Sequence, residues 1–157
     1  MSELAIVAIG SNLGNSRALV LRAMDKLQEL SDKPLLRSSL YETAPVDCPP
    51  GSPNFVNAVA AFEPRATETP ESLLKKLQAL EKEFGRQPKK VLNESRSLDL
   101  DLIAFGNRTS NTPELVLPHP RAHLRRFVLE PLREIAPEFV LRGQKHNIGA
   151  LLASLAQ

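Results

Sequence analysis

The sequence predicts an α+β fold in which helices cover a mainly antiparallel sheet. Short runs of apolar, strand-forming residues alternate along the chain with two longer segments whose apolar residues recur at helical spacing. The chain has 157 residues, which is enough to bury a hydrophobic core without disulfides or structural metals. We therefore expect residues 1–157 to form a single domain.

The first part of the predicted fold is a strand, a helix and two further strands. Residues 4–9 are continuously apolar, as a buried central strand would be. Asn15 can cap the helix that follows. The apolar positions of this helix are Leu19, Ala23, Met24, Leu27 and Leu30. Residues 35–43 and 54–62 predict the next two strands, because the four prolines of the intervening loop at 45–53 cannot donate ladder hydrogen bonds.

A second helix and a fourth strand complete this unit. Thr69 followed by Pro70 is a typical helix start. The apolar stripe of this helix consists of Leu73, Leu74, Leu77, Leu80 and Phe84. Gly85 suits the helix end, and residues 86–97 have no apolar period and predict a basic loop. The alternating pattern over 98–105 predicts the fourth strand.

A smaller C-terminal α/β extension follows. It consists of a short strand over 115–117, a helix over 127–135 with Pro131 near its first turn, and a last short helix capped by Asn147. The preceding β-α-β-β-α-β order is that of the ferredoxin-like sandwich. That arrangement places both helices on one face of the sheet and leaves the opposite face and the loops for function.

Composition excludes several classes of function. The chain has 20 Lys and Arg against 18 Asp and Glu, and its net charge of +2 is too small to indicate nucleic-acid or membrane binding. Cys48 is the single cysteine, which excludes an internal disulfide. The apolar run at 4–9 is too short for a signal peptide or for a spanning helix of about 20 residues. We expect a cytoplasmic monomer.

Two aspartates on the fourth predicted strand are the sharpest chemical feature. In the segment 98–102 side chains alternate between faces, so Asp99 and Asp101 share one face with Cα atoms about 7 Å apart. Paired carboxylates suit Mg²⁺, which completes its coordination with waters and substrate phosphates. The alternative, that both aspartates form the solvated face of an antiparallel strand, stays open on this pattern alone.

The basic loop leads directly into this acidic strand. Arg86 and Arg96 could form salt bridges or could clamp phosphates beside a metal site. On the third predicted strand Phe55 and Asn57 share a face, and an asparagine can both donate to and accept from a heterocycle edge. Core phenylalanines and a turn asparagine are the alternative.

His119 lies between two prolines, and His123 follows four residues later. That spacing could chelate zinc on a helix, but Pro120 and the lack of a third strong ligand argue against it. A histidine beside phosphate, or a structural loop histidine, fits this segment better.

Taken together, these segments resemble the 6-hydroxymethyl-7,8-dihydropterin pyrophosphokinase family. The resemblance covers nearly the whole chain. The motifs that carry it are AIGSNLG at 8–14, YETAP at 41–45, NFVN at 54–57, RSLDLDL at 96–102 and PHPR at 118–121. The family fold is ferredoxin-like α+β, in agreement with the element order above.

The resemblance implies transfer of a pyrophosphoryl group from ATP to the hydroxymethyl oxygen of a pterin, with release of AMP. It implies that Asp99 and Asp101 bind two Mg²⁺ ions and that Arg86 and Arg96 act as catalytic-loop arginines. The residues implied in ATP binding are Gln78, Glu81, Arg96, Leu102, His119 and Arg125. The residues implied in the pterin pocket are Thr43, Val46, Phe55, Asn57 and Phe127.

Two other classes remain as alternatives. A ferredoxin-like RNA-binding module would need aromatic residues on its strands for base stacking, whereas the fourth strand carries Asp99 and Asp101, which repel phosphate unless they bind a metal. A regulatory domain that binds a small ligand without catalysis is distinguished only by an assay for AMP release.

Overall fold

The computed structural model describes residues 3–12, 15–43, 54–84 and 98–155. The elements in chain order are β1 (Ala5–Ser11), α1 (Ser16–Gln28), β2 (Leu36–Arg37), β3 (Tyr41–Thr43), β4 (Phe55–Phe62), α2 (Pro70–Glu83), β5 (Asp99–Phe105), β6 (Ser110–Asn111), β7 (Val116–Leu117), the 3₁₀ helix η1 (Ala122–Leu124), α3 (Arg126–Ile135) and α4 (Ile148–Ser154).

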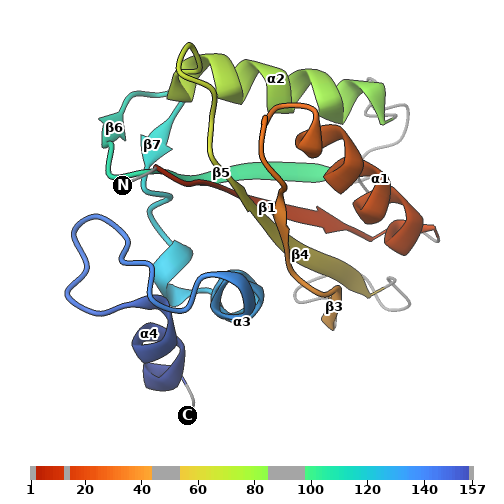
Figure 1. The fold of residues 1–157 in the computed structure, drawn as a ribbon. Helices are drawn as coiled ribbons and strands as arrows, with labels where there is room; N and C mark the ends of the chain where they lie inside the picture. The colour runs from red at the N-terminus through yellow and green to blue at the C-terminus, as the bar shows by residue number, and fades with distance from the viewer. Residues whose placement is uncertain (1–2, 13–14, 44–53, 85–97, 156–157) are drawn as a thin grey trace.

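The main sheet has the strand order β2-β4-β1-β5, and β3 also pairs with β4 (Figure 1). The pairings among these strands are antiparallel, while β6 and β7 form a separate two-stranded sheet. This confirms the predicted α+β class with an antiparallel sheet. Strand β1 continues past residue 9 to Ser11, so Gly10 lies within the sheet and does not end the strand.

Helices cover the sheet on both faces. One core cluster, which includes Val7, Leu27 and Leu77, lies between the sheet and helices α1 and α2. A second cluster, which includes Ile103 and Leu129, lies between the opposite face and helices α3 and α4 (Figure 1). The expectation that this opposite face is left free is therefore wrong for part of its area, because the C-terminal extension folds back over it.

The second predicted strand is interrupted. Leu36 and Arg37 of β2 and Tyr41 of β3 pair with the same strand β4, but the register between the two pairings shifts by one residue. At the break, Ser38 Oγ accepts the Val59 N–H at 2.9 Å. Because this hydroxyl satisfies a strand donor, the chain can bulge here without leaving a buried N–H unpaired.

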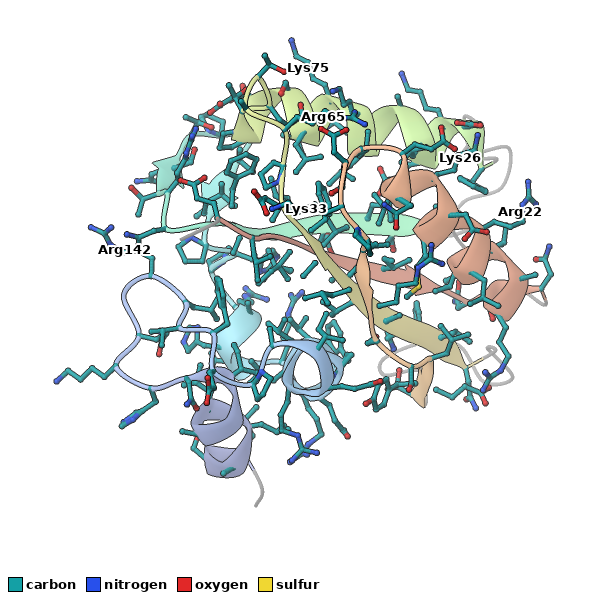
Figure 2. The ribbon with its side chains drawn as sticks, in the orientation of Figure 1. Arg22, Lys26, Lys33, Arg65, Lys75 and Arg142 are labelled. Carbon is teal, nitrogen blue, oxygen red and sulfur yellow. The ribbon has the colours of Figure 1, made fainter. Side chains whose placement is uncertain are left out.

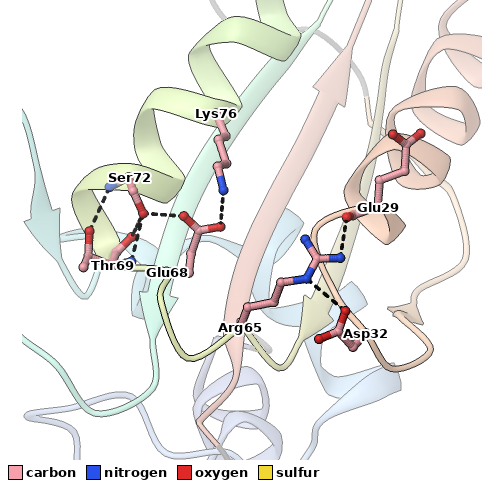
Figure 3. Close-up of polar contacts among 7 residues, drawn as sticks. All are labelled: Glu29, Asp32, Arg65, Glu68, Thr69, Ser72 and Lys76. Carbon is pink, nitrogen blue, oxygen red and sulfur yellow. Dashed lines mark hydrogen bonds and ion pairs between the residues drawn. The ribbon is translucent and has the colours of Figure 1, made fainter.

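Two of the predicted helix caps are present, and two details differ. Thr69 forms a capping box with Ser72 (Figure 3). Asn147 Oδ1 accepts an N–H from the first turn of α4. Asn15 makes no side-chain cap hydrogen bond, because its ψ of 30° is not the extended conformation of such a cap. Pro131 lies inside α3 rather than near its first turn.

The loop between β4 and α2 is tied to the end of α1 by Arg65. Its Nε donates to Asp32 Oδ1 at 2.9 Å, and its terminal nitrogen donates to the Glu29 carbonyl at 3.0 Å (Figure 3). Arg65 lies three residues beyond the end of β4. The contact therefore stabilises the end of the sheet that is opposite to Phe55.

The basic side chains labelled in Figure 2 are spread over the molecule: Arg22 and Lys26 project from α1, Lys75 projects from α2, and Arg142 lies near the C-terminal end of the chain. Within the part of the chain that the structure describes, every helix is too short or too polar to span a bilayer.

Candidate functional site

A cleft with a volume of about 360 Å³ opens beside the start of α3. Its walls combine backbone and side chains of β1, β3, β4, β5 and α3. The lining residues are Ala8, Ile9, Gly10, Thr43, Phe55, Asn57, Ala58, Asp99, Asp101, Arg125 and Phe127. The volume is typical of pockets that bind small molecules. The structure therefore brings seven of the predicted site residues together in one cavity.

The floor of this cleft is a row of three residues across three strands. Gly10 of β1 pairs with Asn57 of β4 on one side and with Asp99 of β5 on the other. Residues directly opposite one another in a sheet point to the same face, and strands lie about 4.8 Å apart. Because glycine has no side chain, the space between the amide and the carboxylate stays open.

The amide of Asn57 is fixed in orientation. Its side chain is buried, and Nδ2 donates to Thr43 Oγ1 at 2.9 Å. A Cβ atom placed on Gly10 would lie 3.3 Å from Asn57 Oδ1, which puts that oxygen beside the glycine. Because the Thr43 hydroxyl accepts this bond, its own hydrogen remains available for a second partner.

The two aspartates lie as the alternation predicts. Leu98, Leu100 and Leu102 are buried in the cluster under α1 and α2, whereas Asp99 and Asp101 both line the cleft on the other face. Asp99 is half-buried and Asp101 is exposed. In the described ranges no group of three or more His, Cys, Asp or Glu side chains is placed to hold a metal ion.

This donor set fits a hard cation such as Mg²⁺. The ion takes one or two protein carboxylates and completes its shell with waters and phosphate oxygens, so two aspartates without a third protein ligand suffice. Asp99 and Asp101 are the residues that would hold it.

A second cavity of about 250 Å³ lies on the other side of β5. Its lining residues are Leu74, Leu100, Asp101, Leu102, Pro113, Glu114, Leu115, Val116, His119 and Pro120. Two residues predicted on the nucleotide side, Leu102 and His119, are here. Asp101 lines both cavities, so its carboxylate lies within reach of ligands in either one.

The hydrogen bonding of His119 selects one imidazole tautomer. Nδ1 accepts the Arg121 N–H at 3.2 Å, so the proton of the neutral ring is on Nε2. Burial lowers the pKa of His119, the positive charge of Arg125 lowers it further, and Asp101 opposes the shift. The ring is therefore neutral near pH 7 and presents an N–H donor.

Comparison with known proteins identifies the family. A model described as 7,8-dihydro-6-hydroxymethylpterin-pyrophosphokinase (HPPK) matches residues 6–137. The chain belongs to this family. A protein of Pseudomonas aeruginosa named 2-amino-4-hydroxy-6-hydroxymethyldihydropteridine pyrophosphokinase is 37% identical over 147 residues, which cover 93% of this chain and 88% of that protein. A protein of the same name from Haemophilus influenzae is 38% identical over 138 residues, which cover 87% of this chain and 84% of that protein.

Two longer relatives contain a matching region. The folic acid synthesis protein fol1 of Pneumocystis carinii is 39% identical over 140 residues, which cover 88% of this chain but only 18% of that protein. The crystal structure of Plasmodium falciparum HPPK-DHPS with pteroate has a TM-score of 0.74 and 15% sequence identity, covering 98% of this chain and 42% of that chain. This structural likeness shows the fold.

Two aromatic side chains frame the cleft of this HPPK-family chain. Phe55 is half-buried on β4, whereas Phe127 on α3 is 41% exposed. The Arg125 guanidinium carbon lies 5.4 Å from the centroid of the Phe127 ring, within the range of a cation–π contact. Both aromatic rings and the Arg125 side chain line the cleft.

Two residues predicted on the nucleotide side lie elsewhere. Glu81 is buried, and its Oε2 accepts the Leu100 N–H at 2.8 Å. This bond satisfies a donor of β5, which is an edge strand, and holds the segment that carries both aspartates. Gln78 is exposed on α2. Neither side chain lines the two cavities.

Sequence reasoning did not single out the backbone floor as part of the site. Gly10, Ala8 and Ala58 line the cleft without supplying a functional group. Strand pairing places Gly10 opposite Asn57 and Asp99, and Ala8 opposite Asp101. Their small size becomes a signal only when this register is known. The remaining site predictions, Val46, Arg86 and Arg96, lie outside the described residues.

We expect His119 to be neutral and protonated on Nε2 in the ligand-free protein at pH 7. Long-range ¹H–¹⁵N spectra recorded between pH 5 and 8 should show this tautomer and a pKa below the ordinary 6.5, with the His119→Gln spectrum giving the assignment. Because glutamine places an N–H near the position of Nε2, His119→Gln should retain more activity than His119→Asn. A ring that is charged at pH 7, or protonated on Nδ1, would contradict the assignment.

Proposed function

We propose that the two cavities are the pterin and ATP halves of one active site. In it the β- and γ-phosphates of ATP pass to the hydroxymethyl oxygen of 6-hydroxymethyl-7,8-dihydropterin, giving AMP and the pterin diphosphate in folate biosynthesis. The observation that carries this assignment is that Asp101 lines both cavities. Membership of the HPPK family supports the same reaction.

The pterin occupies the first cavity. Phe55 and Phe127 contact the two faces of the flat ring, and the Asn57 amide and the Thr43 hydroxyl bind its polar edge, with Val46 as a further contact. Both kinds of contact are supported by the lining of the cleft. The Asn57–Thr43 hydrogen bond fixes the orientation of both side chains before the substrate binds. Binding therefore costs little side-chain entropy at this end of the cleft.

ATP occupies the second cavity, with its phosphates directed toward Asp101. Apolar side chains, including Leu102, surround the base, and the neutral His119 donates Nε2–H to a phosphate oxygen. Arg125, which lines the first cavity and whose charge lowers the pKa of His119, binds phosphate in this proposal. Contacts from Gln78 and Glu81 remain predictions.

Asp99 and Asp101 would hold magnesium, two ions being expected. Bound cations of this kind neutralise phosphate oxygens and make the chain of phosphates a better electrophile. Around them the protein orients the hydroxymethyl group toward the phosphates, supplies positive charge through Arg125, and excludes water with the Phe127 ring. Arg86 and Arg96 add charge from the basic loop.

We also infer that the fold is the ferredoxin-like sandwich. Its support is the strand order, in which the split second strand, β4, β1 and β5 follow one another with α1 and α2 on one face. Three further statements remain predictions: residues 1–157 form one domain, the chain is a monomer, and it resides in the cytoplasm. Light scattering on the purified chain tests the oligomeric state.

An assay of AMP release tests the proposed reaction. The purified chain is incubated with ATP, Mg²⁺ and 6-hydroxymethyl-7,8-dihydropterin, and AMP is measured by chromatography. We expect stoichiometric AMP and pterin diphosphate, and no AMP when either the pterin or the metal is left out. Release of ADP, or no nucleotide turnover, would contradict the proposed reaction. Tight binding of single-stranded RNA would support the alternative that the chain is an RNA-binding module.

A further inference from the structure

A carboxylate outside the cleft joins two of its walls. Glu134, near the end of α3, accepts four hydrogen bonds from Ser39, which lies between β2 and β3, and from Tyr41, the first residue of β3. The Ser39 N–H donates to both of its oxygens at 2.9 and 3.0 Å, the Ser39 hydroxyl donates at 2.9 Å, and the Tyr41 hydroxyl donates at 2.9 Å. The Glu134 carboxylate thus binds three donor groups: the N–H and hydroxyl of Ser39 and the hydroxyl of Tyr41.

The segment that it fastens is the one where strand pairing fails. Ser39 lies between β2 and β3, at the one-residue shift in their register against β4. Ser39 itself belongs to neither pairing. The bonds to Glu134 hold the chain at this break, through the Ser39 backbone and the Ser39 and Tyr41 side chains.

These contacts connect two walls of the cleft, one on α3 and the other on β3 and β4. Phe127 and Glu134 are seven residues apart on α3, about 10 Å and close to two full turns, so they lie on nearly the same side of the helix. Tyr41 and Thr43 are two residues apart on β3 and so share a face. Thr43 in turn accepts from Asn57. Glu134 therefore connects the helix that carries Phe127 to the strand that carries Thr43.

The charge of Glu134 suits this role. Burial acts to raise its pKa, but the hydrogen bonds from the Ser39 N–H, the Tyr41 hydroxyl and the Ser39 hydroxyl outweigh burial and leave the pKa below its ordinary value. The carboxylate is therefore ionised at neutral pH, and bonds to a charged acceptor are stronger than neutral ones. Glu134 is also solvent-exposed, so its replacement leaves the core intact.

We propose that Glu134 is a positioning residue for the pterin: it sets the separation between the Phe127 wall and the Thr43–Asn57 edge of the cleft. This rests on the proposed function, in which the pterin occupies that cleft. It goes beyond that function in assigning control of pterin affinity to a group that does not line either cavity. The residues that line the ATP cavity do not belong to α3, β3 or β4, so we expect ATP affinity to change much less than pterin affinity.

The test separates pterin binding from ATP binding. For Glu134→Ala we expect the KM for 6-hydroxymethyl-7,8-dihydropterin to rise about tenfold, since several charge-assisted bonds are lost, while the KM for ATP changes less than about twofold. Glu134→Gln keeps the length of the side chain but has only one acceptor oxygen. Its KM for the pterin should lie between those of the wild type and Glu134→Ala. In Tyr41→Phe the effect should be smaller, and the double variant with Glu134→Ala should resemble Glu134→Ala alone.

Arg65→Ala is the matched control, because Arg65 also ties two segments by hydrogen bonds from one side chain. It lies beyond the far end of β4, about 23 Å along the strand from Phe55. We expect it to lower the Tm without changing the KM for the pterin. Thermal unfolding of all variants shows which effects are only structural.

Direct titration with the fluorescent oxidised analogue 6-hydroxymethylpterin keeps this test separate from the test of activity. Weaker pterin binding by Glu134→Ala than by Arg65→Ala supports the positioning role even if the wild type were to release no AMP, which would contradict only the proposed function. Equal pterin affinity in wild type and Glu134→Ala would overturn the positioning role of Glu134. A parallel loss of pterin and ATP affinity would overturn it as well.

Discussion

Replacing Asp101 by asparagine should lower the rate of AMP release by about a thousandfold or more, because it removes a charge that, in the proposed function, would hold a cation near the phosphates. Asparagine has nearly the same shape, and Asp101 is exposed, so the fold should be unchanged. The measurement is the steady-state rate at saturating ATP and pterin, with thermal unfolding recorded in parallel.

The two aspartates should not behave identically. Asp101 lines both cavities, whereas Asp99 lines only the first. Asp101→Asn should therefore weaken Mg²⁺-dependent binding of ATP more than Asp99→Asn does, although both variants lose turnover. Titration of each variant with a non-hydrolysable ATP analogue, with and without Mg²⁺, measures this difference.

Asp25→Asn is a suitable control for these variants. Asp25 pairs with Arg37 at 2.9 Å on the surface and lies in neither cavity. Its replacement should leave the rate of AMP release unchanged. A normal rate in Asp101→Asn, or full activity of the wild type after removal of divalent ions with EDTA, would refute the metal assignment.

The second large effect is expected at Gly10. Gly10→Val should lower kcat/KM for the pterin by about a hundredfold, the loss that a displacement of about 1 Å of a binding group can cause. The reason is the cross-strand row, in which a Cβ on residue 10 would already lie 3.3 Å from Asn57 Oδ1. The two additional methyl groups of valine project from the floor of the cleft, between the amide and the carboxylate.

Graded substitutions make this prediction specific. Gly10→Ala should give a smaller loss than valine, because only the Asn57 amide has to shift by a few tenths of an ångström. Gly149→Ala in α4 is the matched control, since a Cβ there meets only ordinary contacts at 3.6 Å and beyond. It should leave kcat/KM unchanged. Equal activity of Gly10→Val and wild type would show that the row does not form the floor of the pterin site.

The strand alternation is the part of the site that sequence alone could predict best. The LDLDL pattern over 98–102 placed the leucines in the core and both aspartates on the other face, and the structure has this arrangement. Phe55 and Asn57 were assigned to one face by the same rule, and both line the cleft. A period of two residues requires no knowledge of distant contacts.

Other parts depend on tertiary contacts that no local pattern contains. The return of α3 over the sheet brings Arg125 and Phe127 to strands far away in the sequence. The interruption at Ser38 depends on a hydroxyl that replaces a backbone group. Glu134 has the composition of an ordinary exposed helical residue, and only its contacts with Ser39 and Tyr41 distinguish it.

The hydrogen bond from Leu100 to Glu81 has a consequence for assembly. β5 is an edge of the main sheet, and an unprotected edge strand can pair with a strand of another molecule and so initiate aggregation. Any strand that approached β5 at Leu100 would have to displace a buried carboxylate from the N–H that it already binds at 2.8 Å. The edge that carries the acidic pair is thereby closed to other chains at this point, while its face stays accessible to small molecules.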